Sequence, residues 1–405
     1  MRGICHTREH LRASGKFDVN LKPHHQGGAS DLRCLRVNAS HGRIVMANDG
    51  IMRGMTAALL ASSLAFTVAD LTPTTPFARP DGAMTVRLTG VTAPCELVVL
   101  DADAKELARA KTDGGEVDLA KIFPSIRAVT RAVRVQTLVD GAPAGAPLLV
   151  VPLVSRATIR TTSAKRPDGV ASYTRIIGWG DEVLEPTNEE YAKLKAAWPK
   201  TDPSPLSGFR LERDRDVIFE TTAGTIRFAM RPDEAPNTAR NFVELAASGF
   251  YDATIVHRIV PADRNGLPFV IQGGDPTGTG DGGPGYDIAL EPSKLAHDFG
   301  VLSMARNDWP DSAGSQWFIG LSREATARLD GQYCAYGYAV EGASAIVAIS
   351  DGEVADAATG RPKSPHTVTR AFVVDAPPWT PGVGRGDARV TRPTSSKQSS
   401  EKSDR

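Results

Sequence analysis

Two groups of residues in this chain have the types and spacing of known chemical sites. Gly278 to Gly283 fits the G-x-G-x-x-G pattern, whose glycines bring a loop close to the phosphates of a dinucleotide. That use requires a strand before the loop and a helix after it, whereas Pro284 to Ile288 predicts a turn and a strand. His257, Asp275 and Ser303 have the side chains of a hydrolase triad, but no nucleophile elbow accompanies them. The sequence therefore argues against nucleotide binding and against hydrolysis.

Five blocks between residues 216 and 375 form a more specific pattern. In chain order they are Val256–Pro261 (VHRIVP), Phe269–Gly280 (FVIQGGDPTGTG), Gly300–Ala305 (GVLSMA), Gly314–Ile319 (GSQWFI) and Leu329–Tyr333 (LDGQY). Together they resemble the cyclophilin family of peptidyl-prolyl cis-trans isomerases, over about two-fifths of the chain. The resemblance implies an isomerase (rotamase) that acts on proline-containing polypeptides during protein folding. It also implies a closed eight-stranded antiparallel β-barrel with two capping helices.

The chemistry of this reaction explains which residues it needs. Resonance holds the peptide bond planar with a rotation barrier of ~18–20 kcal/mol. The cis and trans forms of an X–Pro bond are close in energy, yet they exchange slowly. A catalyst needs a pocket for the proline ring, anchors for the backbone and a fixed donor that stabilises the twisted amide. Because this stabilisation is electrostatic and non-covalent, we expect no cofactor and no metal.

The resemblance also implies a role for individual residues. Arg258 matches the family's catalytic arginine, and Gln272 matches the glutamine that orients it and binds substrate backbone. Without the resemblance, Arg258 would be read as part of a surface salt bridge. The remaining matches form the substrate-binding surface: Phe269, Val270, Phe318 and Leu329 around the proline, Ala305, Arg306 and Gln316 in the groove for the residues before it, Gly280 at the edge of that groove, and Tyr333.

Several residues depart from the family pattern. Tyr333 stands where many members have histidine, and it keeps an aromatic face with one polar tip. Val270 replaces a more usual methionine, and Trp317 replaces a phenylalanine behind the pocket. Arg328 stands where members that bind cyclosporin tightly have tryptophan, which predicts weak cyclosporin binding by this chain.

The largest departure is an insertion at Ala262 to Pro268, where the family has a much shorter connection. Its segment Asp263-Arg264-Asn265-Gly266 predicts a tight turn. Since the insertion lies between Arg258 and Phe269, we expect it to change access to the pocket or the choice of substrate. It also leaves room for an alternative function, a cyclophilin-fold binding or scaffold module with little isomerase activity.

The elements expected around these residues are mostly strands. Val217–Phe219 and Thr225–Phe228 predict a hairpin, and helices fit Pro236–Ala247 and Ala343–Ile349. Residues 214–376 are therefore predicted to form the cyclophilin-like isomerase domain. Alternating and β-branched runs in residues 82–155 predict a small β-sandwich-like domain, as a spacer or as a docking or client-recruiting module. Residues 156–213 are expected to be a linker region, with a short helix that opens on a capping box at Thr187–Glu190.

The two ends of the chain have a different composition. Residues 1–51 are histidine-rich without periodicity, which predicts a disordered leader or a start site placed too early; a metal-binding module is the alternative. Residues 52–69 resemble a signal peptide, because an apolar stretch with small residues follows Arg53; a buried strand or short helix is the alternative. Residues 377–405 predict a disordered tail, in which Arg385-Gly386-Asp387 matches an adhesion motif by chance.

Charge and cysteine content limit the partners and the compartment. The 47 basic residues balance 47 acidic ones, which argues against a nucleic-acid surface. Four scattered cysteines are too few for a disulfide scaffold or a zinc site. No apolar run reaches the length of a membrane-spanning helix, so we expect no stable membrane insertion. We expect a monomer that is periplasmic or secreted if residues 52–69 are a signal peptide, and cytoplasmic otherwise.

Overall fold

The computed structural model of the protein describes residues 69–91, 94–166, 169–198 and 206–393, and two short strands before them. These strands, β1 (Arg36–Asn38) and β2 (Arg43–Val45), pair antiparallel within the first of two units, Met1–Ala65. The second unit is Phe66–Arg405. Apart from β1 and β2, the predicted leader and the candidate signal peptide up to residue 68 lie outside the described residues.

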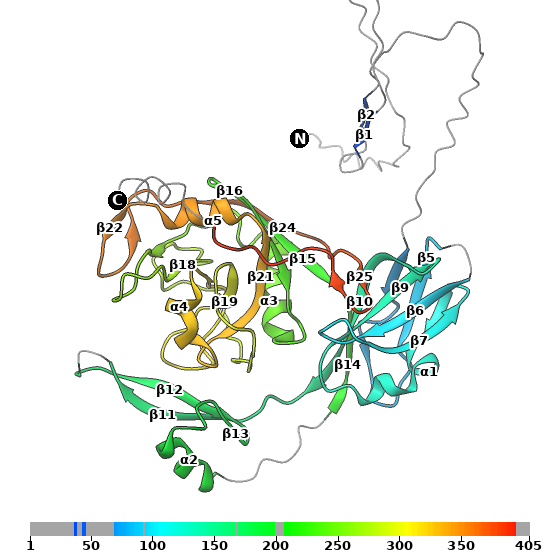
Figure 1. Ribbon diagram of the computed structural model, residues 1–405, viewed down its shortest axis with the longest axis horizontal. Helices are drawn as coiled ribbons and strands as arrows, with labels where there is room; N and C mark the ends of the chain where they lie inside the picture. Colours follow the sequence, from blue (N-terminus) through cyan, green and yellow to red (C-terminus); the bar gives the residue numbers. More distant parts are fainter. Residues whose placement is uncertain are drawn as a thin grey trace, which may run out of the picture. The chain divides into compact units, whose positions relative to one another are not determined.

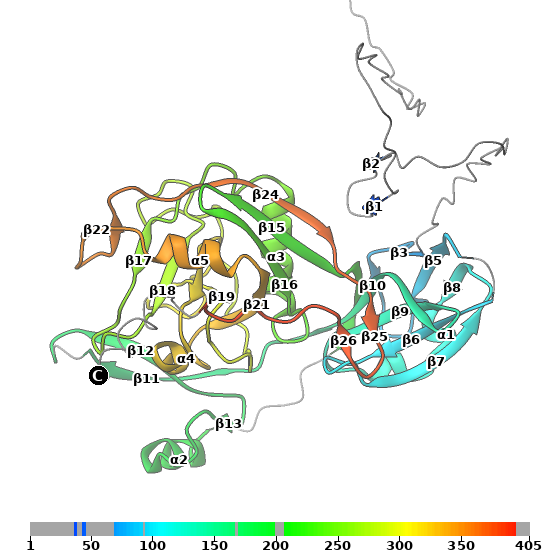
Figure 2. The same ribbon diagram turned by 45° about the horizontal axis from the view of Figure 1, so that its top comes forward.

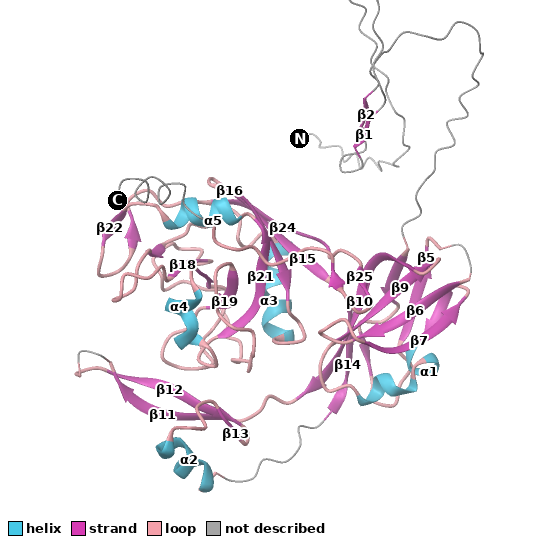
Figure 3. Ribbon diagram, in the orientation of Figure 1, coloured by secondary structure: helices cyan, strands magenta, loops and turns pink. Residues whose placement is uncertain are grey.

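Strands dominate the regular structure of the second unit, which confirms the prediction of a mainly β protein (Figure 3). Within the part of the chain that the structure describes, no helix combines the length and the apolar character needed to cross a membrane.

Two sheets in the N-terminal part of this unit share one core. Its buried side chains, among them Leu71, Val86, Leu97 and Val150, come from both sheets. A short helix, α1 (Leu119–Ile122), and a 3₁₀ turn at Pro124–Ala128 follow β8. The smaller sheet has the order β3 (Asp70–Pro73), β5 (Thr85–Thr89), β8 (Gly115–Asp118). The larger has the order β4 (Phe77–Ala78), β14 (Leu206–Arg213), β10 (Ala142–Val154), β9 (Val133–Val139), β6 (Cys95–Leu100), β7 (Glu106–Thr112).

Strand β14 corrects the prediction that residues 156–213 are only a linker. It pairs with β10 and β4, and it buries Phe209 and Leu211 in the core of the two sheets. Gly208 in β14 has a φ of +147°, and a Cβ there would lie 2.4 Å from the carbonyl oxygen of Ala78. The glycine therefore permits the close approach of β4.

The segment before β14 contains a three-stranded sheet and a helix. The sheet has the order β11 (Ile159–Lys165), β12 (Ser172–Trp179), β13 (Glu182–Val183), and helix α2 covers Glu189–Ala196. The expected helix is present, but the cap is Asn188 and not Thr187, because the Asn188 side chain accepts from the N–H groups of Glu190 and Tyr191. The β12 residues Ile176 and Trp179 join the core of the predicted isomerase domain.

The predicted isomerase domain is built on an eight-stranded antiparallel sheet that curls around its own core. Helices α3 (Pro236–Ala247) and α5 (Ala343–Ser350) pack on it, and α4 (Arg323–Thr326) leads into a 3₁₀ turn at Ala327–Leu329. A small hairpin of β22 (Val354–Asp356) and β23 (Arg361–Pro362) precedes the last strand. The order of the sheet is β17 (Arg258–Val260), β18 (Val270–Gly273), β20 (Trp317–Gly320), β19 (Val301–Met304), β21 (Cys334–Glu341), β16 (Gly224–Met230), β15 (Arg215–Thr221), β24 (Val368–Asp375) (Figure 1).

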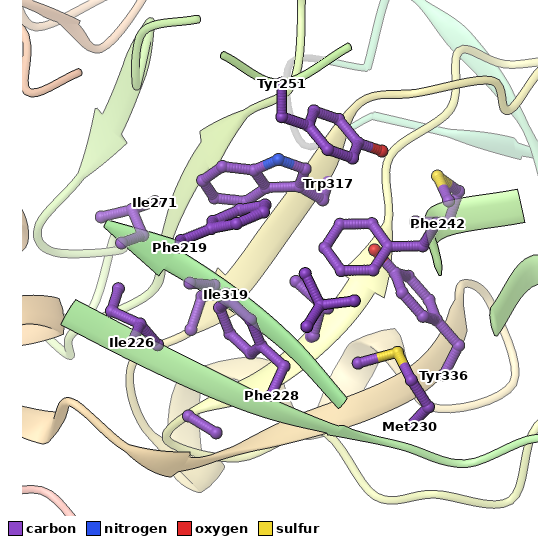
Figure 4. Close-up of a cluster of buried hydrophobic side chains, with 14 of the residues drawn as sticks. Phe219, Ile226, Phe228, Met230, Phe242, Tyr251, Ile271, Trp317, Ile319 and Tyr336 are labelled. Carbon is purple, nitrogen blue, oxygen red and sulfur yellow. The ribbon is translucent and has the colours of Figure 1, made fainter. Parts of the chain in front are cut away.

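Backbone hydrogen bonds also link the segments that lead into the two edge strands of this sheet. The N–H of Val256, before β17, donates to the carbonyl of His366, and the N–H of Val368 in β24 donates to Thr254. Inside the curl, aromatic side chains fill the core (Figure 4). Phe219 packs against Trp317 and Tyr251, and Phe242 packs against Tyr251 and Tyr336. Phe228 meets both phenylalanines edge-on. This core fixes the strands that carry the predicted site.

The C-terminal segment corrects the prediction of a disordered tail from residue 377. Residues 377–393 are ordered around β25 (Trp379–Thr380) and β26 (Gly384–Arg385), which lie beside the six-stranded sheet in Figure 2. The backbone N–H of Trp379 donates to the Gln136 side chain at 2.8 Å, and Arg385 binds Asp216 with two hydrogen bonds. The polar composition of this segment does not reveal its regular structure, because its polar groups bond to buried partners that are far away in sequence. Residues 394–405 lie outside the described range.

Candidate active site

Arg258 and Gln272 lie directly opposite each other on the neighbouring strands β17 and β18. Nη1 of Arg258 donates to Oε1 of Gln272 at 3.1 Å. Arg258 is half-buried, and among the described residues no carboxylate forms an ion pair with it. The guanidinium is thus oriented by a neutral amide and keeps most of its donors free.

The amide of Gln272 also connects Arg258 to a loop through a chain of hydrogen bonds. Its Nε2 donates to Oε1 of Gln316 at 3.0 Å, and Nε2 of Gln316 donates to the carbonyls of Gly280 and Gly282, both at 2.8 Å. The polar groups around Arg258 therefore form one chain, from β17 through β18 and the residue before β20 to the loop.

The side chain of Asp275 holds this loop in place. Its carboxylate is fully buried and accepts from the N–H of Gly280 at 2.6 Å and from the N–H and hydroxyl of Thr277 at 2.7 and 2.8 Å. Burial alone would raise the pKa of Asp275, but these donors outweigh it and lower the pKa to about 2. The glycine-rich stretch is a loop held by a carboxylate, and no helix follows it. The strand expected at Pro284 to Ile288 is reduced to a single bridge between Ile288 and Ala313.

Two adjoining cavities contain all of the predicted site residues in their linings. Gln272, Ala305 and Arg306 line both cavities, so the cavities meet there. The larger, of about 490 Å³, also includes Gly280 and Gln316. The smaller, of about 100 Å³, is lined by Arg258, Phe269, Val270, Gln272, Ala305, Arg306, Phe318, Leu329 and Tyr333.

The floor of the smaller cavity has a support that sequence reasoning missed. The ring of Phe318 stacks on His297, with centroids 5.8 Å apart, and meets Tyr333 edge-on at 5.5 Å. The His297 ring lies between the hydroxyl of Ser303 and the carboxylate of Asp330, both at 2.9 Å. Ser303 therefore faces His297 and not His257, which removes the suspected triad. The spacing of Ser303 from either histidine carries no signal that distinguishes them.

His257 is buried beside this site without a polar partner. Neither ring nitrogen forms a hydrogen bond with any described residue. Burial is the main reason that the pKa of His257 is lowered, and it outweighs the attraction of Asp275. The ring is therefore held in the neutral form, which suits a packing residue behind the cavities.

The departures from the family pattern have structural counterparts. Trp317 is buried, and its indole fills the space over Gly273 and Gly274, where a Cβ would lie 2.6 and 2.7 Å from the nearest indole atoms. In the insertion, the side chain of Asp263 closes the predicted tight turn by accepting from the N–H groups of Asn265 and Leu267. The prediction of weak cyclosporin binding at Arg328 stays a prediction.

Comparison with known proteins finds relatives of the region that contains this site. Residues 216–373 match the family model described as cyclophilin type peptidyl-prolyl cis-trans isomerase. A peptidyl-prolyl cis-trans isomerase of Synechococcus elongatus is 44% identical over 30% of this chain and 77% of its own length. A peptidyl-prolyl cis-trans isomerase-like 1 of Neurospora crassa is 38% identical over 39% of this chain and 94% of its own.

Among solved structures, a cyclophilin type isomerase of Cryptosporidium parvum, studied in the presence of the dipeptide Ala-Pro, shares 29% identity with a TM-score of 0.36. The match covers 40% of this chain and 99% of that one. The enzyme class shown by the sequence matches is a peptidyl-prolyl cis-trans isomerase. The chain belongs to the cyclophilin type family of these enzymes.

Proposed function

We propose that this chain accelerates X–Pro rotation in folding protein clients by holding a guanidinium, that of Arg258, against the twisted amide. The observation that carries the proposal is the orientation of Arg258 by the amide of Gln272 in the lining of a cavity of about 100 Å³ that also includes aromatic and aliphatic side chains. Because the cavity is walled by Phe269 and Phe318, a proline ring there is removed from water next to a fixed cation. A preorganised donor in such a site stabilises charge that develops as amide resonance is lost.

In this proposal the other residues anchor the substrate. Gln272 and Gln316 offer polar groups to the client backbone, while Val270, Leu329 and Tyr333 complete the walls of the proline cavity. Ala305, Arg306 and Gly280 border the larger cavity, which accommodates the residues before proline. Support for a closed barrel under this site comes from the backbone hydrogen bonds between residues 254–256 and 366–368.

An NMR exchange assay on an X–Pro peptide tests the proposal. Arg258→Ala is expected to lower kcat/KM by about 100-fold, the typical cost of one preorganised donor, with the fold retained. Arg258→Lys keeps the charge but loses the planar fork, so an intermediate loss is expected. Arg370→Ala, at an exposed arginine on β24, is the matched control and leaves the rate unchanged. Near-background rates in both the wild type and Arg258→Ala would favour the alternative of a binding or scaffold module.

We also propose export, on the strength of the signal-like sequence of residues 52–69. N-terminal sequencing of the mature protein tests this. A new terminus after Ala65 or Ala69 supports a periplasmic or secreted enzyme, and retention of residues 52–69 indicates a cytoplasmic one. The monomeric state stays a prediction that size-exclusion chromatography with light scattering can test.

A further inference from the structure

The insertion at residues 262–268 is fastened to the rim of the proline cavity by one arginine. Nη1 of Arg328 donates to Oδ2 of Asp263 and to the carbonyl of Ala325, both at 2.9 Å. The Asp263 side chain is only 2% exposed, whereas that of Arg328 is 48% exposed. A buried carboxylate thus anchors a cation that faces solvent.

This cation lies next to the proline cavity. The guanidinium carbon of Arg328 is 4.2 Å from the ring centroid of Phe269, a wall of that cavity, and the next residue, Leu329, is another wall. Nη1 is occupied by its two acceptors, but Nε and Nη2 donate to no residue in the described part of the chain. Three N–H groups therefore remain, in the fork geometry that matches a carboxylate.

The lining of the larger cavity holds two carboxylates and one guanidinium, so its net charge is negative. The larger cavity meets the smaller one at Gln272, Ala305 and Arg306. Its lining includes Asp281 and Asp287 but not Phe269. Neither of these carboxylates forms an ion pair with a described residue. The Arg306 guanidinium there is bound to the carbonyls of Gln332 and Asn307.

An extended client therefore passes from carboxylates on one side of its proline to a guanidinium on the other. We propose that Arg328 is a specificity-determining residue that selects clients with an aspartate or glutamate directly after the proline. This inference rests on the proposed function, because the resemblance assigns the larger cavity to the residues before proline. The residue that follows must then leave past Phe269 and Leu329, within reach of the free fork.

The expected preference is modest because Arg328 is half-exposed. Exposed ion pairs stabilise weakly, so we expect kcat/KM for a glutamate after proline to exceed that for glutamine by about threefold. The same glutamate placed before the proline should be disfavoured, because it would face Asp281 and Asp287. Added salt should reduce the preference, since screening acts strongly on exposed charges.

The test is an NMR exchange assay on matched peptides with glutamate or glutamine directly after proline, and a third with glutamate directly before it. The readout is the ratio of kcat/KM values, which a loss of fold or of general activity does not change. Arg328→Gln should bring the ratio of glutamate to glutamine to one, and Arg328→Lys should restore part of it. Arg370→Gln is the matched control and should leave it unchanged, since Arg370 also lies over a phenylalanine, Phe372, but lines neither cavity.

A wild-type ratio of one, a preference for glutamate before proline, or an unchanged ratio in Arg328→Gln would each overturn the inference. Activity on the glutamine peptide separates this failure from that of the proposed function. If the wild type isomerises that peptide but shows no preference, only the specificity is wrong. If it isomerises none of the peptides, the proposed function is wrong as well.

Discussion

Arg134, at the junction of the two β regions, and Arg258, at the groove formed by the two cavities, have the same side chain in opposite surroundings. Arg134 is 1% exposed and donates to Asp214 at 2.6 Å, with the ring centroid of Trp379 at 3.9 Å. Arg258 is half-buried and donates to a neutral amide. A buried guanidinium needs a carboxylate partner to offset its lost hydration. A guanidinium without a carboxylate partner can instead interact electrostatically with a ligand. For Arg134 and Arg258, the nature of the partner therefore distinguishes a structural role from a chemical one.

The C-terminal segment extends the junction. Arg385 makes two hydrogen bonds to the fully buried Asp216, at 3.0 and 2.8 Å, and Arg227 donates to the same carboxylate. Asp387 binds the other edge of the Arg385 guanidinium. The Arg385-Gly386-Asp387 triplet is thus occupied by internal ion pairs, which agrees with the interpretation that its match to an adhesion motif is accidental.

The largest effect is expected at the junction. Arg134→Ala leaves Asp214 buried without its cation, which should lower the free energy of unfolding by about 3–5 kcal/mol. Arg131→Ala is the matched control: its side chain is 55% exposed and pairs with Glu234, so a loss below about 1 kcal/mol is expected. Urea unfolding measures both, with Arg134→Lys as a milder variant. Equal losses in the two alanine variants would contradict the structural role of Arg134.

The next largest effect is expected from giving Arg258 in the groove a carboxylate partner, as Arg134 has at the junction. Gln272→Glu places a carboxylate opposite Arg258, which should divert the guanidinium from substrate and lower kcat/KM by roughly 10- to 100-fold. Gln272→Ala removes the orientation but adds no carboxylate, so it should retain more activity. Stability should stay within about 1 kcal/mol of the wild type in both, because the site is partly exposed. A glutamate variant as active as the alanine variant would show that pairing does not silence this arginine.

The sequence predicted the groove much better than the junction, and the reason is physical. Val217–Phe219, Thr225–Phe228 and the helix at Pro236–Ala247 follow from local periodicity, and the structure confirms them as parts of β15, β16 and α3. The residues of the groove are grouped in short blocks that carry the family resemblance. Recognising one block therefore also identifies the site residues that lie next to one another within it.

The junction depends on pairs of residues far apart in the chain. Arg134 and Asp214 are 80 residues apart, and Gln136 and Trp379 are 243 apart. No local pattern links such residues, so β14 was predicted as linker and residues 377–393 as a tail. The same holds for Gln332, whose side chain bonds both the N–H and the carbonyl of Ile176. A hairpin outside the isomerase region is thereby attached beside Tyr333.

The smallest effect concerns His257, which is buried like Arg134 but, like Arg258, forms no ion pair with a described carboxylate. Burial lowers its pKa in the folded state below the ordinary 6.5, so the unfolded chain binds the proton more readily. Well above pH 6.5 the ring is neutral in both the folded and the unfolded state, so its titration does not lower the free energy of unfolding. As the pH falls from 6.5 towards the folded-state pKa, the unfolded chain binds the proton first, and the free energy of unfolding decreases. The wild type should lose roughly 1 kcal/mol more than His257→Gln between neutral and mildly acidic pH. Urea unfolding of the two proteins across this range measures the difference, and parallel curves would mean that the ring accepts its proton in the folded state as easily as in the unfolded one.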